Sequence, residues 1–408
     1  SGSVQNQDAY MQTTAAQRPY FYDHIADINY QMMDEFYELT GRRYGRIHTW
    51  NVEKADYLIV GMGSMLVQAH AVAEYLKKTR KLNVGVLDVT MFRPFPGDLI
   101  GKALKGKKGV TVLERTDQPL AEDLPLMREV RAALSKCIEN GQADKQLPWP
   151  DYETYSSFKD MPKLFSGAYG LGSRDLQPEG LVGTIENMLP DGKQLKFFYL
   201  GIDFVREAAN PKQEVHIQNL LESYPAIDRM AIRGSENPNL MPENSITVRM
   251  HSAGGWGAIT TGKNLAMTLY DLLGFEIRAN PKYGSEKKGQ PTTYYLAAAP
   301  ERIPLNCEYH YVDVVISPDP NVFGHSNPLA GLKKGGVFII QSVLTDEELW
   351  ASLPRKSQQF IIDNEIHVYT IDGFKIAREE ATDPELQLRM QGNAFQGAFF
   401  AASPLMEM

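Results

Sequence analysis

The sequence contains little cysteine: only Cys137 and Cys307 occur, far apart in a chain of 408 residues. Two cysteines do not make a disulfide framework, and their scarcity indicates a reducing, cytoplasmic compartment. They also cannot supply the four thiolates that hold an iron–sulfur cluster. The eight histidines form no HxxxH or HExxH pair, so the sequence predicts no metal site.

Long apolar runs and an excess of positive charge are absent as well. No stretch approaches the ~20 apolar residues that a membrane-spanning helix needs, so no membrane contact is expected. The opening SGSVQNQDAY is polar and lacks the apolar segment of a secretory signal. With 42 basic and 50 acidic residues the net charge is −8, which argues against nucleic acid as a partner. An anionic ligand would therefore have to meet a local basic cluster.

Short apolar segments alternate with amphipathic segments along most of the chain, which is typical of an α/β fold. The pattern predicts strands at 57–60, 84–89, 110–114, 195–202, 246–250, 275–280, 292–299, 312–317, 335–341 and 366–372. It predicts helices at 25–39, 65–78, 94–104, 120–138, 181–189 and 264–273. We therefore expect two successive three-layer α/β domains with mostly parallel sheets.

Composition suggests where these domains begin and end. Residues 1–50 are polar and aromatic and too short for a core, so they are expected to be the end of a preceding domain or an arm. The first α/β domain is expected at 51–205, an irregular linker at 206–244 and the second domain at 245–408. Residues 141–180, rich in Pro, Gly, Ser and Asp, are expected to form a long loop with a functional or contact role.

The stretch GMGSM (61–65) follows a predicted strand and precedes a predicted helix, as a dinucleotide-binding turn would. A Rossmann fingerprint needs Gly or Ala three residues after its second glycine, and Leu66 stands there. Asp88 could imitate the ribose-binding acid, but any strand end can carry an Asp. A tight strand-to-helix turn is the favoured interpretation.

A second Gly-rich turn, GGWGAITTGKN (254–264), resembles a phosphate-binding P-loop. Asn264 replaces the Ser or Thr that binds Mg²⁺ in such loops, so an NTPase is disfavoured. Free N–H groups of a Gly-rich turn still favour an anion. Trp256 could stack on a base or cap a channel, or it could pack beneath the loop.

The local basic cluster lies in PKYGSEKKGQPTTYY (281–295), where Lys282, Lys287 and Lys288 fall within seven residues. Several lysines on a turn suit a ligand with several phosphates, although a solvated loop explains the spacing equally well. Ligands of α/β sheets bind beyond the carboxyl ends of strands. Both this loop and the Gly-rich turn leave strands at that edge, as do the polar residues around His325, where ordinary turn chemistry is the alternative.

Two stretches, SAGGWGAITTGKNLA (252–266) and KYGSEKKGQPTTYYL (282–296), closely resemble the γ-type domain of 2-oxoacid:ferredoxin oxidoreductases, most of all those acting on pyruvate. The segments TGRRYG, ADYLIVGMGSM, VGVLDVTMFRPFPGDLI and VTVLERTDQP resemble the same family's domain that is similar to the transketolase C-terminal domain. YGLGSRDLQPE and YLGI match the end of that domain. The resemblance covers nearly the whole chain in the family's order.

This resemblance implies oxidative decarboxylation of a 2-oxoacid, pyruvate being expected, with coenzyme A to give an acyl-CoA, CO₂ and two electrons for ferredoxin or flavodoxin. Thiamine diphosphate, magnesium and iron–sulfur clusters would belong to other domains of the full enzyme, which is expected to be a homodimer. We expect this chain to be an internal piece or one subunit, inactive alone, with no catalytic residue and no metal. Its partners would be the remaining domains or subunits.

The family's γ-type domain is implicated in holding coenzyme A, which gives the expected site of this chain. Carried over, the site residues are Gly254, Gly255, Trp256, Gly257, Lys282, Tyr283, Gly284, Ser285, Lys287 and Lys288. The lysines are expected to meet the pyrophosphate and the ribose phosphate. The alternatives are a non-catalytic assembly module of another redox enzyme, such as a sulfite reductase flavoprotein, and an oxidoreductase for a different 2-oxoacid.

Overall fold

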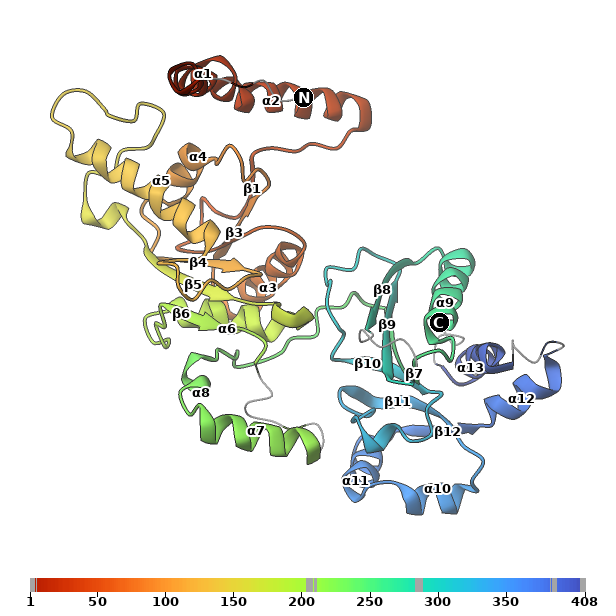
Figure 1. The fold of residues 1–408 in the computed structure, drawn as a ribbon. Helices are drawn as coiled ribbons and strands as arrows, with labels where there is room; N and C mark the ends of the chain where they lie inside the picture. The colour runs from red at the N-terminus through yellow and green to blue at the C-terminus, as the bar shows by residue number, and fades with distance from the viewer. Residues whose placement is uncertain are drawn as a thin grey trace. The chain divides into compact units, whose positions relative to one another are not determined.

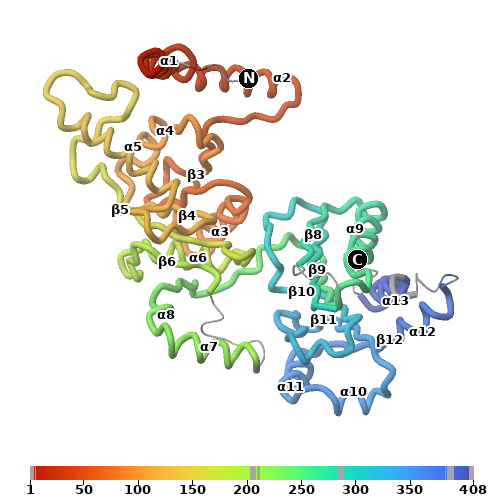
Figure 2. Tube along the Cα trace, in the orientation of Figure 1, coloured from red at the N-terminus to blue at the C-terminus, as the bar shows by residue number. Residues whose placement is uncertain are grey.

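The computed structural model describes residues 4, 6–202, 208, 211–282, 289–381, 383 and 387–403. The chain divides into two compact units, Ser1–Gly172 with Leu181–Tyr199, and Ser173–Gly180 with Leu200–Met408 (Figure 1, Figure 2). Each unit contains a six-stranded sheet with flanking helices, so the predicted α/β class is confirmed. Residues 173–180 belong to the second unit, and the chain then returns to the first unit at residue 181. The composition of the sequence does not reveal this crossing. The domain boundaries expected from the sequence stay predictions.

The first sheet has the strand order β1-β3-β2-β4-β5-β6. β1 runs antiparallel to β3, and the other neighbouring pairs are parallel. The strands are β1 (Ile47–Trp50), β2 (Tyr57–Gly61), β3 (Val84–Val89), β4 (Gly109–Glu114), β5 (Lys163–Ala168) and β6 (Phe197–Tyr199). The helices of this part of the chain are α3 (Met65–Arg80), α4 (Gly97–Leu104), α5 (Pro125–Gln142) and α6 (Pro178–Met188), with short 3-10 turns η2 (Phe158–Asp160) and η3 (Leu171–Ser173).

The inner strands of this sheet are buried on both faces, as parallel strands covered by helices are. On one face Leu58 and Val60 of β2 pack with Ile100 of α4 and Val130 of α5. Ile59, between them in the strand, is also fully buried and points to the opposite face, because successive strand residues alternate. The apolar runs of the sequence are therefore a consequence of burial on both sides.

The amino-terminal arm consists of α1 (Gln7–Tyr20), the 3-10 turn η1 (Tyr22–His24) and α2 (Ile25–Thr40). Neither α-helix has a buried residue, so this segment adds nothing to the core. α2 is the helix predicted from the apolar spacing, and it ends at Gly41, which has a φ of 70°. α1 was not predicted from the sequence.

The second sheet has the order β12-β11-β10-β7-β9-β8. β7, β10, β11 and β12 are mutually parallel, whereas β9 is antiparallel to both β7 and β8. The strands are β7 (Ile246–Ala253), β8 (Glu276–Lys282), β9 (Pro291–Ala299), β10 (Val312–Ser317), β11 (Leu332–Gln341) and β12 (His367–Ile371). The helices are α7 (Pro211–Ser223), α8 (Ile227–Met230), α9 (Ala258–Leu273), α10 (Asp346–Ser352), α11 (Arg355–Asp363), α12 (Gly373–Glu380) and α13 (Gln387–Ala402), with the 3-10 turn η5 (Val322–Gly324).

Helices cover both faces of this sheet, which gives the three layers expected. Leu269 of α9 and Phe399 of α13 pack with Val248 of β7 on one face. Leu349 of α10 and Ile361 of α11 belong to the apolar cluster on the other. Figure 1 shows α9 and α13 on one side of the strands, and α10 and α11 on another.

Two segments expected to be irregular contain regular structure. The predicted loop at 141–180 contains β5, an interior strand of the first sheet. Its Gly167 is needed because a Cβ there would lie 2.7 Å from the ring of Phe198, yet a glycine inside a short run reads as a turn. The predicted irregular segment near 206–244 contains α7 and α8. Polar residues of α7 such as Lys212 and Glu214 are exposed on that helix, whereas residues 232–245 are irregular as expected.

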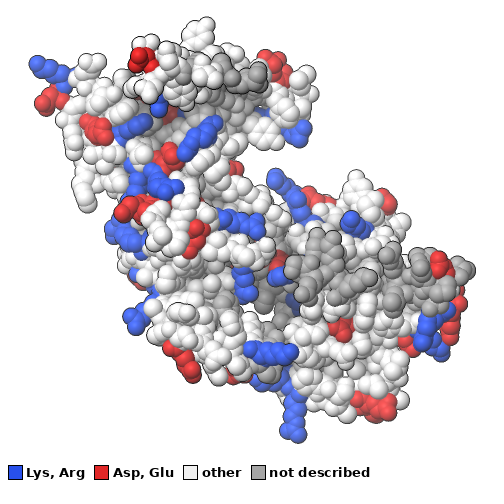
Figure 3. Space-filling view, viewed as in Figure 1, with Lys and Arg blue, Asp and Glu red and all other residues white. Residues whose placement is uncertain are grey.

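The distribution of surface charge and the apolar character of the helices are both ordinary. On the face drawn in Figure 3, basic and acidic side chains lie interspersed among uncharged ones. No helix in the described part of the chain has the length and apolar character needed to cross a membrane. Among the described residues no three His, Cys, Asp or Glu side chains gather as a metal site would require.

Candidate anion-binding edge of the second unit

The topology of the second sheet marks one position at its carboxyl edge. From β7 the chain passes through α9 to β8 and β9 on one side, while β10, β11 and β12 extend the sheet on the other. Ligands of open α/β sheets bind where the strand order reverses in this way. The predicted turn 254–257 directly follows β7 and therefore lies at this position.

Glycine makes the turn possible. Gly255 and Gly257 have φ values of 94° and 83°, which residues with a Cβ rarely adopt. α9 begins immediately afterwards, and its first helical bond runs from the Thr261 N–H to the Gly257 carbonyl at 2.9 Å. The N–H groups of residues 258–260 precede this bond, as at the start of any α-helix, and can donate to an anion.

The turn is hydrogen-bonded to the end of the basic loop. The Gly254 N–H donates to the Gln290 carbonyl at 2.8 Å, and the Gly289 N–H donates to the Gly254 carbonyl at 3.0 Å. These bonds continue the antiparallel pairing of β7 and β9, in which Ala253 faces Pro291. The structure thus brings together the two stretches that the sequence singled out. The predicted site residues Tyr283, Gly284, Ser285, Lys287 and Lys288 lie outside the described residues.

Trp256 is half-buried and contacts the carboxyl-terminal helices. Its ring lies edge-to-face against Phe374 of α12, with the centroids 5.3 Å apart. Its carbonyl accepts the Gln391 side-chain amide of α13 at 3.4 Å. Trp256 therefore packs against Phe374, as one of the two interpretations expected, and the exposed part of its ring remains available to a ligand.

The resemblance to a P-loop ends at the backbone. Residues 258–262, which would be loop in a phosphate-binding P-loop, already form the first turns of α9. Gly262 lies against Tyr294 of β9, where a Cβ would meet the ring carbon Cε1 at 2.4 Å. Lys263 is exposed. The Gly-Lys pair thus serves helix-to-sheet packing, and the absence of a hydroxyl at Asn264 has no bearing on this role.

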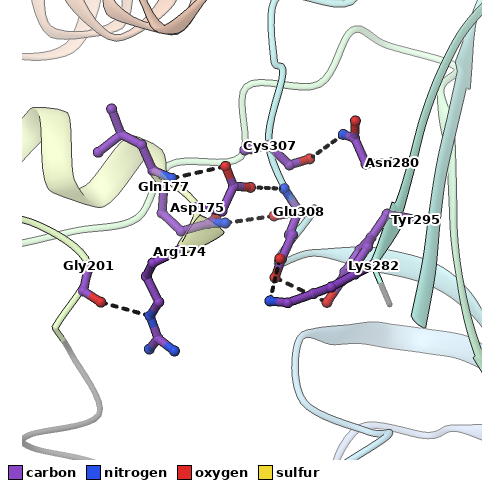
Figure 4. A network of polar contacts seen from close by, with 10 residues as sticks. Arg174, Asp175, Gln177, Gly201, Asn280, Lys282, Tyr295, Cys307 and Glu308 are labelled. Atoms are coloured by element: carbon purple, nitrogen blue, oxygen red, sulfur yellow. Dashed lines mark hydrogen bonds and ion pairs between the residues drawn. The ribbon is translucent and has the colours of Figure 1, made fainter. Parts of the chain in front are cut away.

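Lys282, the remaining predicted phosphate ligand, already has a carboxylate partner (Figure 4). Its ammonium group forms an ion pair with Glu308, whose carboxylate also accepts the Tyr295 hydroxyl at 3.3 Å. The Glu308 N–H donates to the Asp175 carboxylate, and the Glu308 carbonyl accepts the Gln177 amide at 2.7 Å. Burial, together with the nearby Glu308, raises the pKa of Asp175. Lys282 is thereby anchored at the start of the basic loop.

A buried arginine lies beneath this edge of the sheet. Arg249 of β7 is 6% exposed, and its guanidinium donates to the carbonyls of Pro328 and Ala330 at 2.8 and 2.5 Å. Its Nε donates to Nε2 of His251 at 3.0 Å. Burial lowers the pKa of Arg249, and these three acceptors replace the water that the buried cation no longer contacts. Arg249 therefore fixes the loop after β10 to β7.

One histidine contacts this arginine, and a second acts electrostatically on the first. His251 accepts from Arg249, and burial, with Arg249 and His325, lowers the pKa of His251 to about 3. His325 contacts the Asp319 carboxylate through Nε2 at 2.6 Å. The sequence pointed to His325 but not to Arg249, His251 or Asp319. A charged residue in the middle of the apolar strand ITVRM was the one signal that could have drawn attention to Arg249.

Comparison with known proteins decides the family. Residues 247–408 match the family model "Pyruvate ferredoxin/flavodoxin oxidoreductase", and residues 55–143 match "Pyruvate:ferredoxin oxidoreductase core domain II". The chain belongs to the 2-oxoacid:ferredoxin oxidoreductase family. The two matched regions fall in the second and the first unit respectively, as the resemblance of the motifs predicted.

Relatives in this family match almost all of the chain. The probable pyruvate-flavodoxin oxidoreductase of Escherichia coli is 25% identical over 93% of the chain, and the putative enzyme of Synechocystis sp. is 27% identical over 98%. The chain spans 29% of the length of each of these relatives. A solved 2-oxoglutarate:ferredoxin oxidoreductase from Magnetococcus marinus, with 2-oxoglutarate, coenzyme A and succinyl-CoA bound, is 17% identical over 40% of this chain and 33% of its own, with a TM-score of 0.29. A likeness at that score supports no inference about this chain.

Proposed function

We propose that this chain takes part in the oxidative decarboxylation of a 2-oxoacid, pyruvate first, and that its second unit forms one wall of the coenzyme A site. One observation carries the proposal. The Gly254 turn and the end of the lysine-rich loop are joined by two backbone hydrogen bonds at 2.8 and 3.0 Å. The N–H donors at the start of α9 and the carboxyl-terminal end of the segment whose sequence carries Lys287 and Lys288 are thereby held at one region of the sheet edge.

The chemistry of coenzyme A suits such a region. Its pyrophosphate and ribose phosphate are acceptors for the N–H groups at the start of α9 and for ammonium groups of Lys287 and Lys288. Lys282 would contribute less, because Glu308 already neutralises it. Trp256, with one side of its ring on Phe374, would offer the rest of its surface to an apolar or aromatic part of the ligand.

The remaining parts of the enzyme are proposed from the family. Thiamine diphosphate with magnesium, and iron–sulfur clusters, would be bound by other domains or subunits, and ferredoxin or flavodoxin would accept the electrons. A four-thiolate cluster does not fit this chain, which has two cysteines, and both are buried. A homodimeric, cytoplasmic full enzyme completes the proposal. The chain alone is expected to show no turnover with pyruvate and coenzyme A.

Calorimetric titration of coenzyme A into the complete enzyme tests the site. Lys287→Ala/Lys288→Ala is expected to weaken binding by about 10-fold or more for each lysine–phosphate ion pair removed, since hydrogen bonds to charged groups contribute ~1.5–3 kcal/mol. Lys77→Ala/Lys78→Ala on the exposed surface of α3 removes the same charge elsewhere and is the matched control. Equal affinity of the loop variant and the control would refute the proposal.

The ligand can be truncated as well as the protein. Coenzyme A without its ribose phosphate should bind the wild-type enzyme more weakly, and the weakening caused by the lysine variant should then be smaller. Unchanged affinity of the loop variant together with normal pyruvate turnover would remove the coenzyme A role and keep the enzyme assignment. Turnover that is absent from the complete wild-type enzyme would instead favour the assembly-module alternative.

A further inference from the structure

A cavity of about 360 Å³ opens at the carboxyl edge of the first sheet. It lies where the strand order reverses: β2 leads through α3 to β3 on one side, and β4 leads towards β5 and β6 on the other. Its walls come from residues just after the carboxyl ends of the strands, such as Met62 after β2 and Arg115 after β4. Both its position and its size are those of small-molecule sites in α/β proteins.

The lining is mostly apolar and is held by the core of the unit. Leu113 and Leu126 are almost completely buried, at 1% and 2% exposure, and form the inner wall. Phe92 and Met62 lie nearer the outside, and Met62 is 36% exposed. Such walls favour an apolar ligand body, since apolar surface that is removed from water stabilises the complex.

The carboxylate of Glu114, in the cavity wall, already accepts hydrogen bonds from the protein backbone. Its two carboxylate oxygens accept the N–H groups of Leu126 and Met127 at the start of α5, at 2.6 and 3.1 Å. Burial raises the pKa of Glu114. The carboxylate thus replaces water at the first turn of α5.

Arg115 supplies the positive charge of the cavity. Its Nε donates to the Gly170 carbonyl at 3.3 Å, and its stem lies against Gly170, where a Cβ would come within 2.8 Å of Arg115 Cγ. Gly170 has a φ of 71°, so both its backbone angle and this approach require glycine. The terminal nitrogens of the guanidinium have no carboxylate partner among the described residues. Tyr169, also in the lining, adds a hydroxyl.

We propose that this cavity is a binding site for a small monoanion with an aromatic or branched apolar body, its acid group on Arg115 and its body between Met62, Phe92 and Leu126. The carboxylate of such a ligand can accept two N–H groups of one guanidinium. Of the two charged residues in the lining, only Arg115 is cationic, so the acid group of the ligand is placed on Arg115 and not beside Glu114. The residues that line this cavity all belong to the first unit, whereas those of the proposed coenzyme A wall belong to the second.

Calorimetry and saturation-transfer NMR on the full chain test this with 4-phenylbutyrate and its neutral analogue 4-phenylbutyramide. Arg115→Gln is expected to lower the affinity for 4-phenylbutyrate about 10-fold and to leave the affinity for 4-phenylbutyramide unchanged. Arg42→Gln, at an exposed arginine just after α2 and outside the lining, makes the same charge change and should alter the affinity for neither ligand. Met62→Trp, at the exposed mouth, should weaken both ligands by narrowing the cavity.

Two results would overturn the proposal. The first is the absence of saturable binding of 4-phenylbutyrate to the wild-type chain, which would leave the cavity to a protein segment. The second is binding that is insensitive to both Arg115→Gln and Met62→Trp. Coenzyme A affinity of the complete enzyme should be the same with and without Arg115→Gln, so failure here and failure of the coenzyme A proposal are separate outcomes.

Discussion

The carbonyl of Gly254 accepts the N–H of Gly289 at 3.0 Å, which joins the turn before α9 to the end of the lysine-rich loop. Backbone bonds of this kind do not depend on side-chain identity, so they hold the two segments together whatever the loop carries. Gly289 has a φ of 76°, a conformation that a residue with a Cβ adopts only at a cost. The hydrogen bond therefore requires glycine at position 289 for the backbone conformation of its donor, and not at position 254.

Gly289→Ala is expected to reduce the free energy of unfolding by about 1–2 kcal/mol, the cost of placing a Cβ in the left-handed region. The space around Gly289 is open, so no clash adds to this cost. Gly274→Ala at the end of α9 is the matched control, with a φ of 66° and equally open surroundings. Urea unfolding should show a similar destabilisation of both variants, whereas only Gly289→Ala should lower the affinity for coenzyme A. Equal coenzyme A binding by the two variants would contradict the proposed role of this link.

Gly262→Ala should destabilise the second unit even though alanine is the better helix former. In an open helical position the change would stabilise by up to about 1 kcal/mol. Here the new methyl group would stand 2.4 Å from Tyr294 Cε1, and such overpacking costs about 1–3 kcal/mol. Gly397→Ala in α13, with open surroundings, should stabilise. Shifts of the urea midpoint with opposite sign are expected, and a stabilised Gly262→Ala variant would show that this packing is loose.

His251 gives the second unit a defined response to acid. The pKa of His251 is lowered from 6.5 to about 3 by burial, Arg249 and His325. Below pH 6.5 the unfolded imidazole takes up a proton that the folded one does not, so stability falls as the pH falls. The contribution approaches ~1.4 kcal/mol per pH unit and ends near the folded pKa.

His251→Gln keeps an acceptor for Arg249 and removes the titration. Between about pH 7.5 and about pH 5 it should lose roughly 2 kcal/mol less of its unfolding free energy than the wild type, measured by urea titration. His367→Gln, on an exposed position of β12, is the control and should keep the wild-type dependence. A wild-type dependence in His251→Gln would mean that His251 is not held neutral in the folded chain.

Composition identified β2 directly, whereas it did not reveal β5. YLIV (57–60) is buried on both faces, so its composition alone identifies β2. β5 has Ser166 and Gly167 in its interior, because Phe198 and Leu113 leave no room for a Cβ at Gly167. That crowding comes from neighbouring strands, which a local reading of the sequence does not contain.

The same distinction applies to the candidate site. The Gly-rich turn and the basic loop were recognisable, since glycine and lysine patterns are local. The partners of Lys282 were not, because Glu308 and Asp175 reach it from distant segments. The clamp of Arg249 on the carbonyls of Pro328 and Ala330 is likewise formed only after the chain folds back over β7.

Trp256 can serve in packing, in ligand binding or in both, because its ring contacts Phe374 at a centroid distance of 5.3 Å and is partly exposed. A double-mutant cycle with Trp256→Leu and Phe374→Leu should give a coupling of about 0.5–1.5 kcal/mol in the free energy of unfolding, as aromatic pairs do. Additive effects of the two substitutions would show that the edge-to-face packing contributes nothing beyond burial.

Coenzyme A affinity of the same variants in the complete enzyme separates the two roles. If the exposed side of Trp256 meets the ligand, Trp256→Leu should weaken coenzyme A, whereas Phe374→Leu should change it much less. Trp350→Leu, on a partly exposed tryptophan of α10 (39% exposed), controls for removal of an indole elsewhere in the unit. Equal weakening by Trp256→Leu and Phe374→Leu would assign Trp256 to the support of the turn, since both variants would then act by loosening the same pair.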